Sequence, residues 1–257
     1  MEICVLASGS SGNCFYIGDK KTKQGVLVDA GISSKQIVER LESIGRKTSS
    51  IKGIFITHEH SDHIRGADVF ARQFNIPIFA TKKTAGSCFL CSDDKLINNI
   101  KSNGSVELGG FDIESFSKSH KAVDPVSFSI YGKKKVSIIT DLGFCCKNTI
   151  KNVSDSDFLC LESNHDINLL ENGPYPYYLK QWIRGDVGHL SNMQSSLCVL
   201  EHASPKLKYI VLSHLSKTNN SPEIAVHTFN SLIKERRDLS PKILISQREY
   251  PTNVINI

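Results

Sequence analysis

The stretch IFITHEHSDH, residues 54–63, decides how the rest of the chain is interpreted, because three histidines and an aspartate follow a short apolar run. Imidazole nitrogen and carboxylate oxygen are the ligands that zinc, manganese and iron sites use. The apolar run is typical of a buried strand, and the residues after it of a turn into a helix. On such a turn His58 and His60 can share one metal, while Asp62 and His63 can reach a second metal nearby.

A polar loop that happens to be rich in histidine is the alternative interpretation of this stretch. The whole chain has only nine histidines, so three of them within six residues are hard to attribute to chance. The sequence therefore predicts a metal site at this turn.

The composition is that of an ordinary globular protein: 40% of the 257 residues are hydrophobic, and the formal net charge is +5. A mildly basic chain is compatible with a polyanionic substrate but does not identify one. No apolar stretch approaches the roughly 20 residues that a membrane span needs. The first residues show no basic lead-in and no signal-peptide core, so we expect a cytoplasmic protein whose eight cysteines are reduced thiols.

Short apolar runs alternate with helix-like segments along the chain. We expect strands at 2–7, 13–17, 25–29, 77–80, 104–107, 111–116, 126–131, 136–140, 158–161 and 209–212. We expect helices at about 65–74, 82–90, 175–184, 192–203 and 222–236, and a polar loop at 93–103. This pattern predicts an α/β (α+β) protein in which two sheets pack face to face with helices outside, each half of the chain supplying one sheet.

The first turn, SGSSGN at residues 8–13, is rich in small residues that let backbone N–H groups approach an anion. An ordinary hairpin turn is the other interpretation, and the residues alone favour it. Within this turn Ser10 and Asn13 are the candidate substrate contacts.

Asp29 ends the apolar strand 25–29. An aspartate at the end of a buried strand needs a hydrogen-bond partner. A metal-bound histidine or water that donates a hydrogen bond to Asp29 would supply one.

The same event recurs along the chain: an apolar strand ends, and a metal-binding or acidic side chain follows at once. It happens at Asp29, His58, His120, Asp141, Glu162 and His214. Taken singly, each of these has an ordinary explanation as a loop histidine or a turn cap. Residues at the ends of adjacent strands can converge on one edge of a sheet, so together they indicate a single site.

These motifs resemble those of the metallo-β-lactamase superfamily across essentially the whole chain. The pattern HxHxDH matches residues 58–63, and later motif positions match His120, Asp141 and His214. The resemblance implies one domain, residues 1–257, folded as an αββα sandwich of two mixed sheets with helices outside and a two-metal site between the sheets. It assigns His58, His60 and His120 to one metal, assigns Asp62, His63 and His214 to the other, and makes Asp141 the bridging ligand.

Within the superfamily, Asp141 stands where class B β-lactamases place a cysteine, which argues against an antibiotic hydrolase. Glu162, the segment GHLS at 188–191 and His214 resemble the RNase Z-like phosphodiesterase branch. The chain is most similar to the YycJ family, also called WalJ or VicX, in the segments SGSSGN, ESNHD, GPYP, GHLSN and LSHLSKTNN. That family is described as processing nucleic acid. The chain has no room for the β-CASP insertion of RNase J-type nucleases and shows no tRNA-clamping arm, so we do not expect tRNA maturation.

The resemblance implies that two divalent ions, zinc or manganese, activate a hydroxide that attacks a phosphodiester in line. Asp62 would accept a hydrogen bond from this nucleophile. His189 would protonate the leaving 3′-oxygen, with Glu162 orienting its ring. Without the resemblance, His189 is simply a histidine at the start of a helix. His165 lies near the same edge and is a further candidate substrate contact.

We therefore expect a metal-dependent phosphodiester hydrolase, a 5′-to-3′ exonuclease that acts on DNA more readily than on RNA. The alternatives are a small-molecule or cyclic phosphodiesterase, a thioester hydrolase of the glyoxalase II kind, and a nucleic-acid-binding regulator without turnover. The complete ligand set weighs against the last of these. We expect no membrane partner, and the sequence leaves a homodimer open.

Overall fold

The structure is a computed structural model that describes residues 1–257, and the chain divides into two compact units. Unit 1 comprises residues 1–117, 122–133 and 247–257, and unit 2 comprises residues 118–121 and 134–246. The C-terminal segment therefore belongs to the same unit as the N-terminus. None of the helices combines the length and the apolar character needed to cross a membrane.

Unit 1 contains a mixed seven-stranded sheet in the order β14-β1-β2-β3-β4-β5-β6. Its strands are β1 (Glu2–Ala7), β2 (Cys14–Gly18), β3 (Gly25–Val28), β4 (Ile51–Phe55), β5 (Ile78–Thr81), β6 (Ile97–Ile100) and β14 (Ile255–Asn256). The pairings among β14, β1, β2 and β3 are antiparallel, and those from β3 to β6 are parallel. The helices of this unit are α1 (Ser34–Ser43), α2 (Ser61–Ile64), α3 (Ala67–Phe74) and α4 (Lys82–Ser87).

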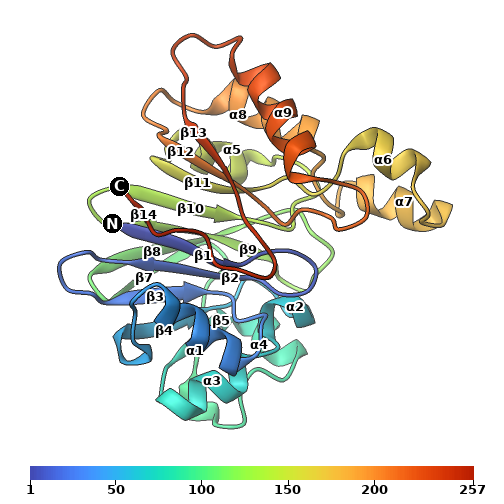
Figure 1. Ribbon diagram of the computed structural model, residues 1–257. Helices are drawn as coiled ribbons and strands as arrows, with labels where there is room; N and C mark the ends of the chain where they lie inside the picture. The colour runs from blue at the N-terminus through green and yellow to red at the C-terminus, as the bar shows by residue number, and fades with distance from the viewer. The chain divides into compact units, whose positions relative to one another are not determined.

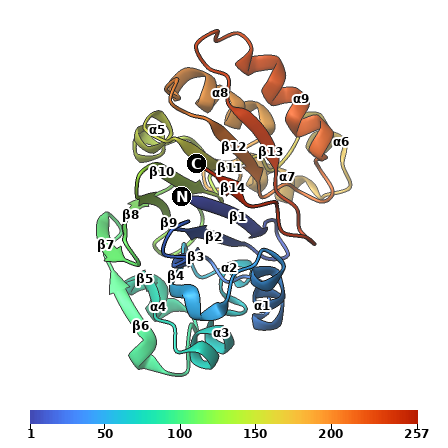
Figure 2. The same cartoon turned by 60° about the vertical axis from the view of Figure 1, so that its left-hand side comes forward.

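The two faces of this sheet are both covered, which explains why β4 is apolar at consecutive positions. Ile54 and Ile56 belong to the buried cluster that includes Ile37 of α1 and Phe70 of α3, and both helices lie together against the sheet in Figures 1 and 2. Phe55 points to the other face. Its ring lies edge-on to Phe128 of β9, with the ring centroids 5.5 Å apart. β9 (Val126–Tyr131) is part of an antiparallel group with β7 (Gly104–Leu108) and β8 (Phe111–Ser117).

Unit 2 is built on four parallel strands, β10 (Lys135–Ile139), β11 (Phe158–Glu162), β12 (Tyr209–Ser213) and β13 (Lys242–Ile245). Its helices are α5 (Lys147–Ser154), α6 (Ile167–Asn172), α7 (Tyr177–Arg184), α8 (Asn192–His202) and α9 (Pro222–Ile233). Figure 1 shows α8 and α9 side by side, next to β12 and β13. Because parallel strands end at a common edge, the residues that follow β10, β11 and β12 lie close together.

Two sequence-based expectations are wrong, and two short helices were missed. The polar stretch 93–103 is not only loop: β6 pairs in parallel with β5 through its backbone, and its asparagines hide the strand pattern. The short helices α5 and α6 were not predicted, since both are under three turns long and α5 is largely polar. The two halves do not each supply one sheet, because β14 pairs with β1, with Glu2 opposite Asn256.

A buried ion pair ties the start of β1 to the loop after α1. The Glu2 carboxylate, with a side chain only 2% exposed, accepts hydrogen bonds from Arg46 Nε and Nη2, both at 2.6 Å. Tyr16 Oη donates a third hydrogen bond to Glu2, at 3.0 Å. Burial by itself raises the pKa of Glu2, but the hydrogen bonds from Arg46 and Tyr16 outweigh it, so the pKa lies below its usual range.

Replacing Arg46 with methionine should lower the free energy of unfolding at pH 7 by about 3 kcal/mol, because the Glu2 carboxylate would stay buried without its cation. A carboxyl whose folded pKa is lowered contributes stability above its unfolded pKa, and that contribution is lost as the pH falls through the folded value. The deficit of the variant should therefore shrink below about pH 4. Urea unfolding from pH 3 to pH 7 measures it, and the double variant E2Q/R46M should recover most of the loss. A deficit that is the same at both pH limits would contradict the assignment.

Candidate metal centre and catalytic residues

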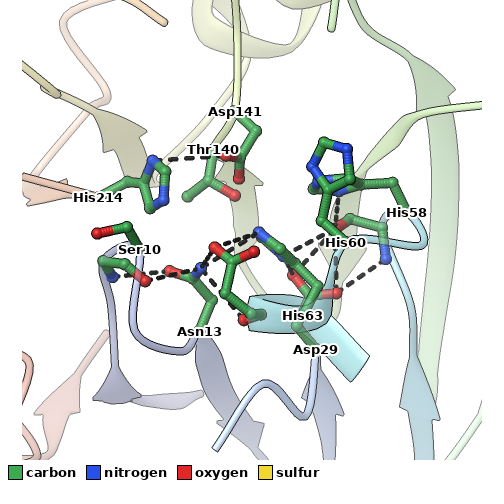
Figure 3. Close-up of polar contacts among 12 residues, drawn as sticks. Ser10, Asn13, Asp29, His58, His60, His63, Thr140, Asp141 and His214 are labelled. Carbon is green, nitrogen blue, oxygen red and sulfur yellow. Dashed lines mark hydrogen bonds and ion pairs between the residues drawn. The ribbon is translucent and has the colours of Figure 1, made fainter. Parts of the chain in front are cut away.

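The histidine-rich turn of unit 1 follows β4 and leads directly into α2. His58 Nε2 lies 3.0 Å from His60 Nδ1, and the His58 ring centroid lies 4.1 Å from that of His63. His60 is the N-cap of α2, so Asp62 and His63 fall in the first turn of that helix. His58 and His63 are fully buried, while His60 and Asp62 are partly exposed. The turn thus brings all four predicted ligands of this unit together, as Figure 3 shows for the histidines.

Asp29 fixes the orientation of His63. Its Oδ2 lies 2.7 Å from His63 Nδ1, and its Oδ1 accepts a hydrogen bond from the Thr57 backbone N–H at 2.9 Å. The backbone of Asp29 is left-handed, with φ of 61°. With Nδ1 donating to Asp29, the lone pair of His63 lies on Nε2, which is 3.2 Å from Asn13 Nδ2 and 3.4 Å from Asp62 Oδ2. A histidine held in this way at one nitrogen presents the other to a metal.

The parallel strands of unit 2 bring four side chains of ligand type within 4.8 Å of one another: Asp141, Glu162, His189 and His214. Asp141 and His214 follow β10 and β12, and both have left-handed backbones, with φ of 55° and 57°. His189 lies in the loop between α7 and α8, where its backbone N–H donates to Ile183 O at 2.7 Å. The sequence predicted the strand-end positions but not their backbone conformation.

Glu162 is the centre of this group. Its Oε1 lies 2.8 Å from His189 Nδ1 and 2.8 Å from His214 Nδ1. Its Oε2 accepts hydrogen bonds from the backbone N–H groups of Leu142 and Leu190, at 2.7 and 3.2 Å. Burial raises the pKa of this carboxyl, but the charges and hydrogen bonds of the two histidines overcome that effect and lower the pKa to about 2. Glu162 is therefore an anion that orients two rings.

His120 is also in unit 2, with its Nδ1 3.3 Å from the carbonyl oxygen of Gly188. Burial lowers the pKa of His120 to about 3, so the ring is neutral at pH 7. A neutral imidazole whose Nδ1 donates to a carbonyl keeps its lone pair on Nε2. This is the state in which a histidine binds a metal.

The remaining predicted residues have different surroundings. Asn13 is buried and accepts a hydrogen bond from Gly9 N at 2.9 Å, so it closes its own turn. Ser10 is exposed on the same turn. His165 is buried, its Nδ1 has no hydrogen-bond partner, and burial lowers its pKa to about 4.

Two residues near these groups were not predicted. Lys118 is buried and donates from Nζ to Thr140 O at 2.6 Å, so it fixes the end of β10. Trp182 of α7 packs edge-on against His189, with centroids 5.5 Å apart. The only signal for Trp182 is that the chain has one tryptophan and that it precedes the GHLS segment.

The donor set fits a divalent metal. Unit 1 and unit 2 each offer imidazole nitrogens together with carboxylate oxygens. Histidine and carboxylate ligands of this kind suit zinc and also permit manganese. The thiolate ligands of structural zinc sites are not among the predicted residues.

Comparison with known proteins supports the superfamily that the sequence motifs indicate. A family model described as "Metallo-beta-lactamase superfamily" matches residues 7–125. The exodeoxyribonuclease YycJ of Bacillus anthracis is 34% identical over 245 residues, which cover 92% of this chain and 90% of that protein. The exodeoxyribonuclease WalJ of Streptococcus pneumoniae is 40% identical over 227 residues, which cover 86% and 84% of the two chains. The chain belongs to the YycJ/WalJ family of the metallo-β-lactamase superfamily.

Membership in the YycJ/WalJ family confirms the predicted fold class, two mixed sheets with helices. The crystal structure of the metallo-β-lactamase fold protein YhfI from Bacillus subtilis matches with a TM-score of 0.68, covering 98% of both chains at 14% identity, and supports the fold alone. The curated relatives and the superfamily support a metal-dependent nuclease that acts on phosphodiester bonds. Together with the histidine and aspartate clusters, they also support divalent metal binding.

Replacing Asp29 with asparagine should weaken metal binding by roughly 10- to 100-fold, because the amide cannot hold the Nδ1 proton of His63 as the carboxylate does. Competition with a chromogenic chelator for Zn²⁺ and Mn²⁺ measures the affinity. The control D112N removes the same charge from an exposed position of β8. Unchanged metal affinity in D29N would show that Asp29 serves only the fold.

Proposed function

We propose that this protein is a metal-dependent 5′-to-3′ exonuclease that degrades DNA in preference to RNA, acts as a single domain of residues 1–257 and works in the cytoplasm. The observation that carries the proposal is the match to proteins named exodeoxyribonuclease over about nine-tenths of both chains. The arrangement of Glu162 between two histidines supports it, because phosphodiester cleavage needs a proton donor for the leaving oxygen.

We assign the metal ligands as the superfamily resemblance implies. One ion would be held by His58, His60 and His120, the other by Asp62, His63 and His214, with Asp141 shared between them. A pair of zinc or manganese ions, when bound, supplies a water that ionises near neutral pH and positive charge for the scissile phosphate. Asp62, Glu162 and His189 provide the remaining chemistry.

His189 is the proposed general acid for the leaving 3′-oxygen. Glu162 Oε1 holds its Nδ1 at 2.8 Å and so fixes the orientation of the ring. Nε2 is then the ring nitrogen from which a proton can pass to the leaving oxygen. Trp182 packs against the ring edge and limits its rotation. Asp62 accepts a hydrogen bond from the attacking water, and Ser10, Asn13 and His165 are the proposed substrate contacts.

Replacing His189 with alanine should reduce turnover of a phosphodiester by about 10²- to 10⁴-fold, because the leaving oxygen would lose its proton donor. Metal content should stay at the wild-type value, since we do not count His189 among the ligands. Initial rates and metal analysis of the same samples measure both quantities. H202A, which removes a histidine from α8, is the matched control. Near-wild-type turnover in H189A with unchanged metal content would remove His189 from the mechanism.

A time course on end-labelled polymers tests the activity itself. We expect stepwise loss from the 5′ end of DNA in the presence of Mn²⁺ or Zn²⁺, slower loss from RNA, and none in chelator or in the D62A/H63A double variant. Duplex and single-stranded substrates labelled at either end distinguish polarity. Cleavage of bis-p-nitrophenyl phosphate or a cyclic nucleotide while every polymer stays intact would replace the nuclease by a small-molecule phosphodiesterase.

A further inference from the structure

The C-terminal segment places an arginine on the SGSSGN turn. Arg248 Nη1 donates to Ser10 Oγ at 3.3 Å, across 238 residues of sequence. A Cβ atom on Gly9 would lie 2.6 Å from Arg248 Nη1 and 2.7 Å from its Cζ. Glycine at this position, where φ is 140°, therefore lets the guanidinium rest directly on the backbone of the turn.

A second, buried arginine holds that segment in place. Arg40 of α1 is 9% exposed and donates from Nη1 to Leu6 O at 2.7 Å and to Arg248 O at 3.0 Å. Its Nη2 donates to Glu249 O at 2.8 Å. The backbone N–H of Ser8 also donates to Gln247 O at 3.1 Å. Arg248 thus stands on a backbone that is fixed to both β1 and α1.

A third arginine reaches the turn from α2. Arg65, the C-cap of that helix, is exposed and donates from Nη1 to Ser11 O at 3.2 Å. Two guanidinium groups therefore contact consecutive residues of one turn. Two residues further along, Asn13 Nδ2 lies 3.2 Å from Asp62 Oδ2, and Figure 3 shows Ser10 and Asn13 on the same turn beside His63.

We infer that Arg248 and Arg65, together with the hydroxyls of Ser10 and Ser11, bind the terminal 5′-phosphate of a DNA strand. The inference rests on the proposed exonuclease activity and adds how the enzyme recognises its end. Guanidinium groups bind phosphate oxygens through paired hydrogen bonds. A terminal phosphate carries up to two negative charges at neutral pH and an internal diester only one, so two arginines match the terminal group better. In a 5′ exonuclease the terminal phosphate lies one nucleotide from the bond that is cleaved, so its binding site must adjoin the metal centre. The turn meets this requirement because it continues into Asn13, which contacts the proposed metal ligand Asp62.

The proposed phosphate site is tested by measuring DNA binding in the absence of metal, where no cleavage occurs. Fluorescence anisotropy in chelator compares oligothymidylates that differ only in a 5′-phosphate or a 5′-hydroxyl. The wild type should prefer the phosphorylated strand about 10-fold, and R248Q or R65Q should each remove most of that preference. R248K keeps the positive charge but lacks the paired N–H donors of the guanidinium group, so it should retain only part of the preference for the phosphorylated strand. R237Q, the same charge change at an exposed position beyond α9, should keep it in full.

The preference within one variant separates recognition from misfolding, because an unfolded variant loses both strands equally. Equal binding of the two strands by the wild type, or an unchanged preference in R248Q, would overturn the inference even where the labelled time course shows exonuclease activity. Inorganic phosphate should compete with the phosphorylated strand at least 10-fold less well than thymidine 5′-monophosphate does. Equal competition would show a site for free phosphate instead of a strand end. Failure of the time course with the binding preference intact would reject the proposed activity and leave the phosphate site.

Discussion

Both units depend on one constraint, the need to satisfy a carboxylate that is completely buried. Asp29 and Glu162 are 0% exposed. An unpaired charge in such a position is destabilising by several kcal/mol. Each carboxylate accepts backbone N–H bonds from a neighbouring strand end or loop, and each uses its remaining oxygen to hold histidine Nδ1 atoms. The orientation of His63, His189 and His214 therefore follows from a requirement of folding, and the rings are set before any metal or substrate arrives.

Backbone conformation adds to this preorganisation. Five residues other than glycine have positive φ, and three of them are predicted site residues that follow strands: Asp29, Asp141 and His214. The left-handed region disfavours such residues by roughly 1–2 kcal/mol each. The other two, Lys23 and Asn75, lie in a polar turn and at the C-cap of α3, where this conformation is common. Strain that recurs at the same place after separate strands is a feature of functional sites, and here it coincides with the residues that the sequence pattern selects.

The sequence selected Asp29, His58, Asp141, Glu162 and His214 as candidate site residues because each stands at the end of an apolar strand, and that pattern is local; their roles remain predictions. It predicted the fold class through the same motifs, which comparison with relatives confirms. It could not predict Lys118 or Trp182, whose importance comes only from what they touch. It gave no sign that Arg248 reaches Ser10, because the contact spans nearly the whole chain and involves a segment held by Arg40 and by the backbone of Ser8. The strand β6 was missed because its two asparagines hide the apolar pattern by which the other strands were recognised.

One oxygen of Glu162 contacts both the proposed general acid, His189, and a proposed metal ligand, His214. Oε1 lies 2.8 Å from both His189 and His214, so the proposed acid and a proposed metal ligand depend on the same lone pairs. When His189 is protonated, its hydrogen bond to Glu162 strengthens and the bond to His214 weakens in return. Loss of the carboxylate would release both rings together, and an effect on turnover could not then be divided between them. The acid role is therefore isolated only at His189 itself, which is the one member of the group that touches Glu162 without a place among the metal ligands.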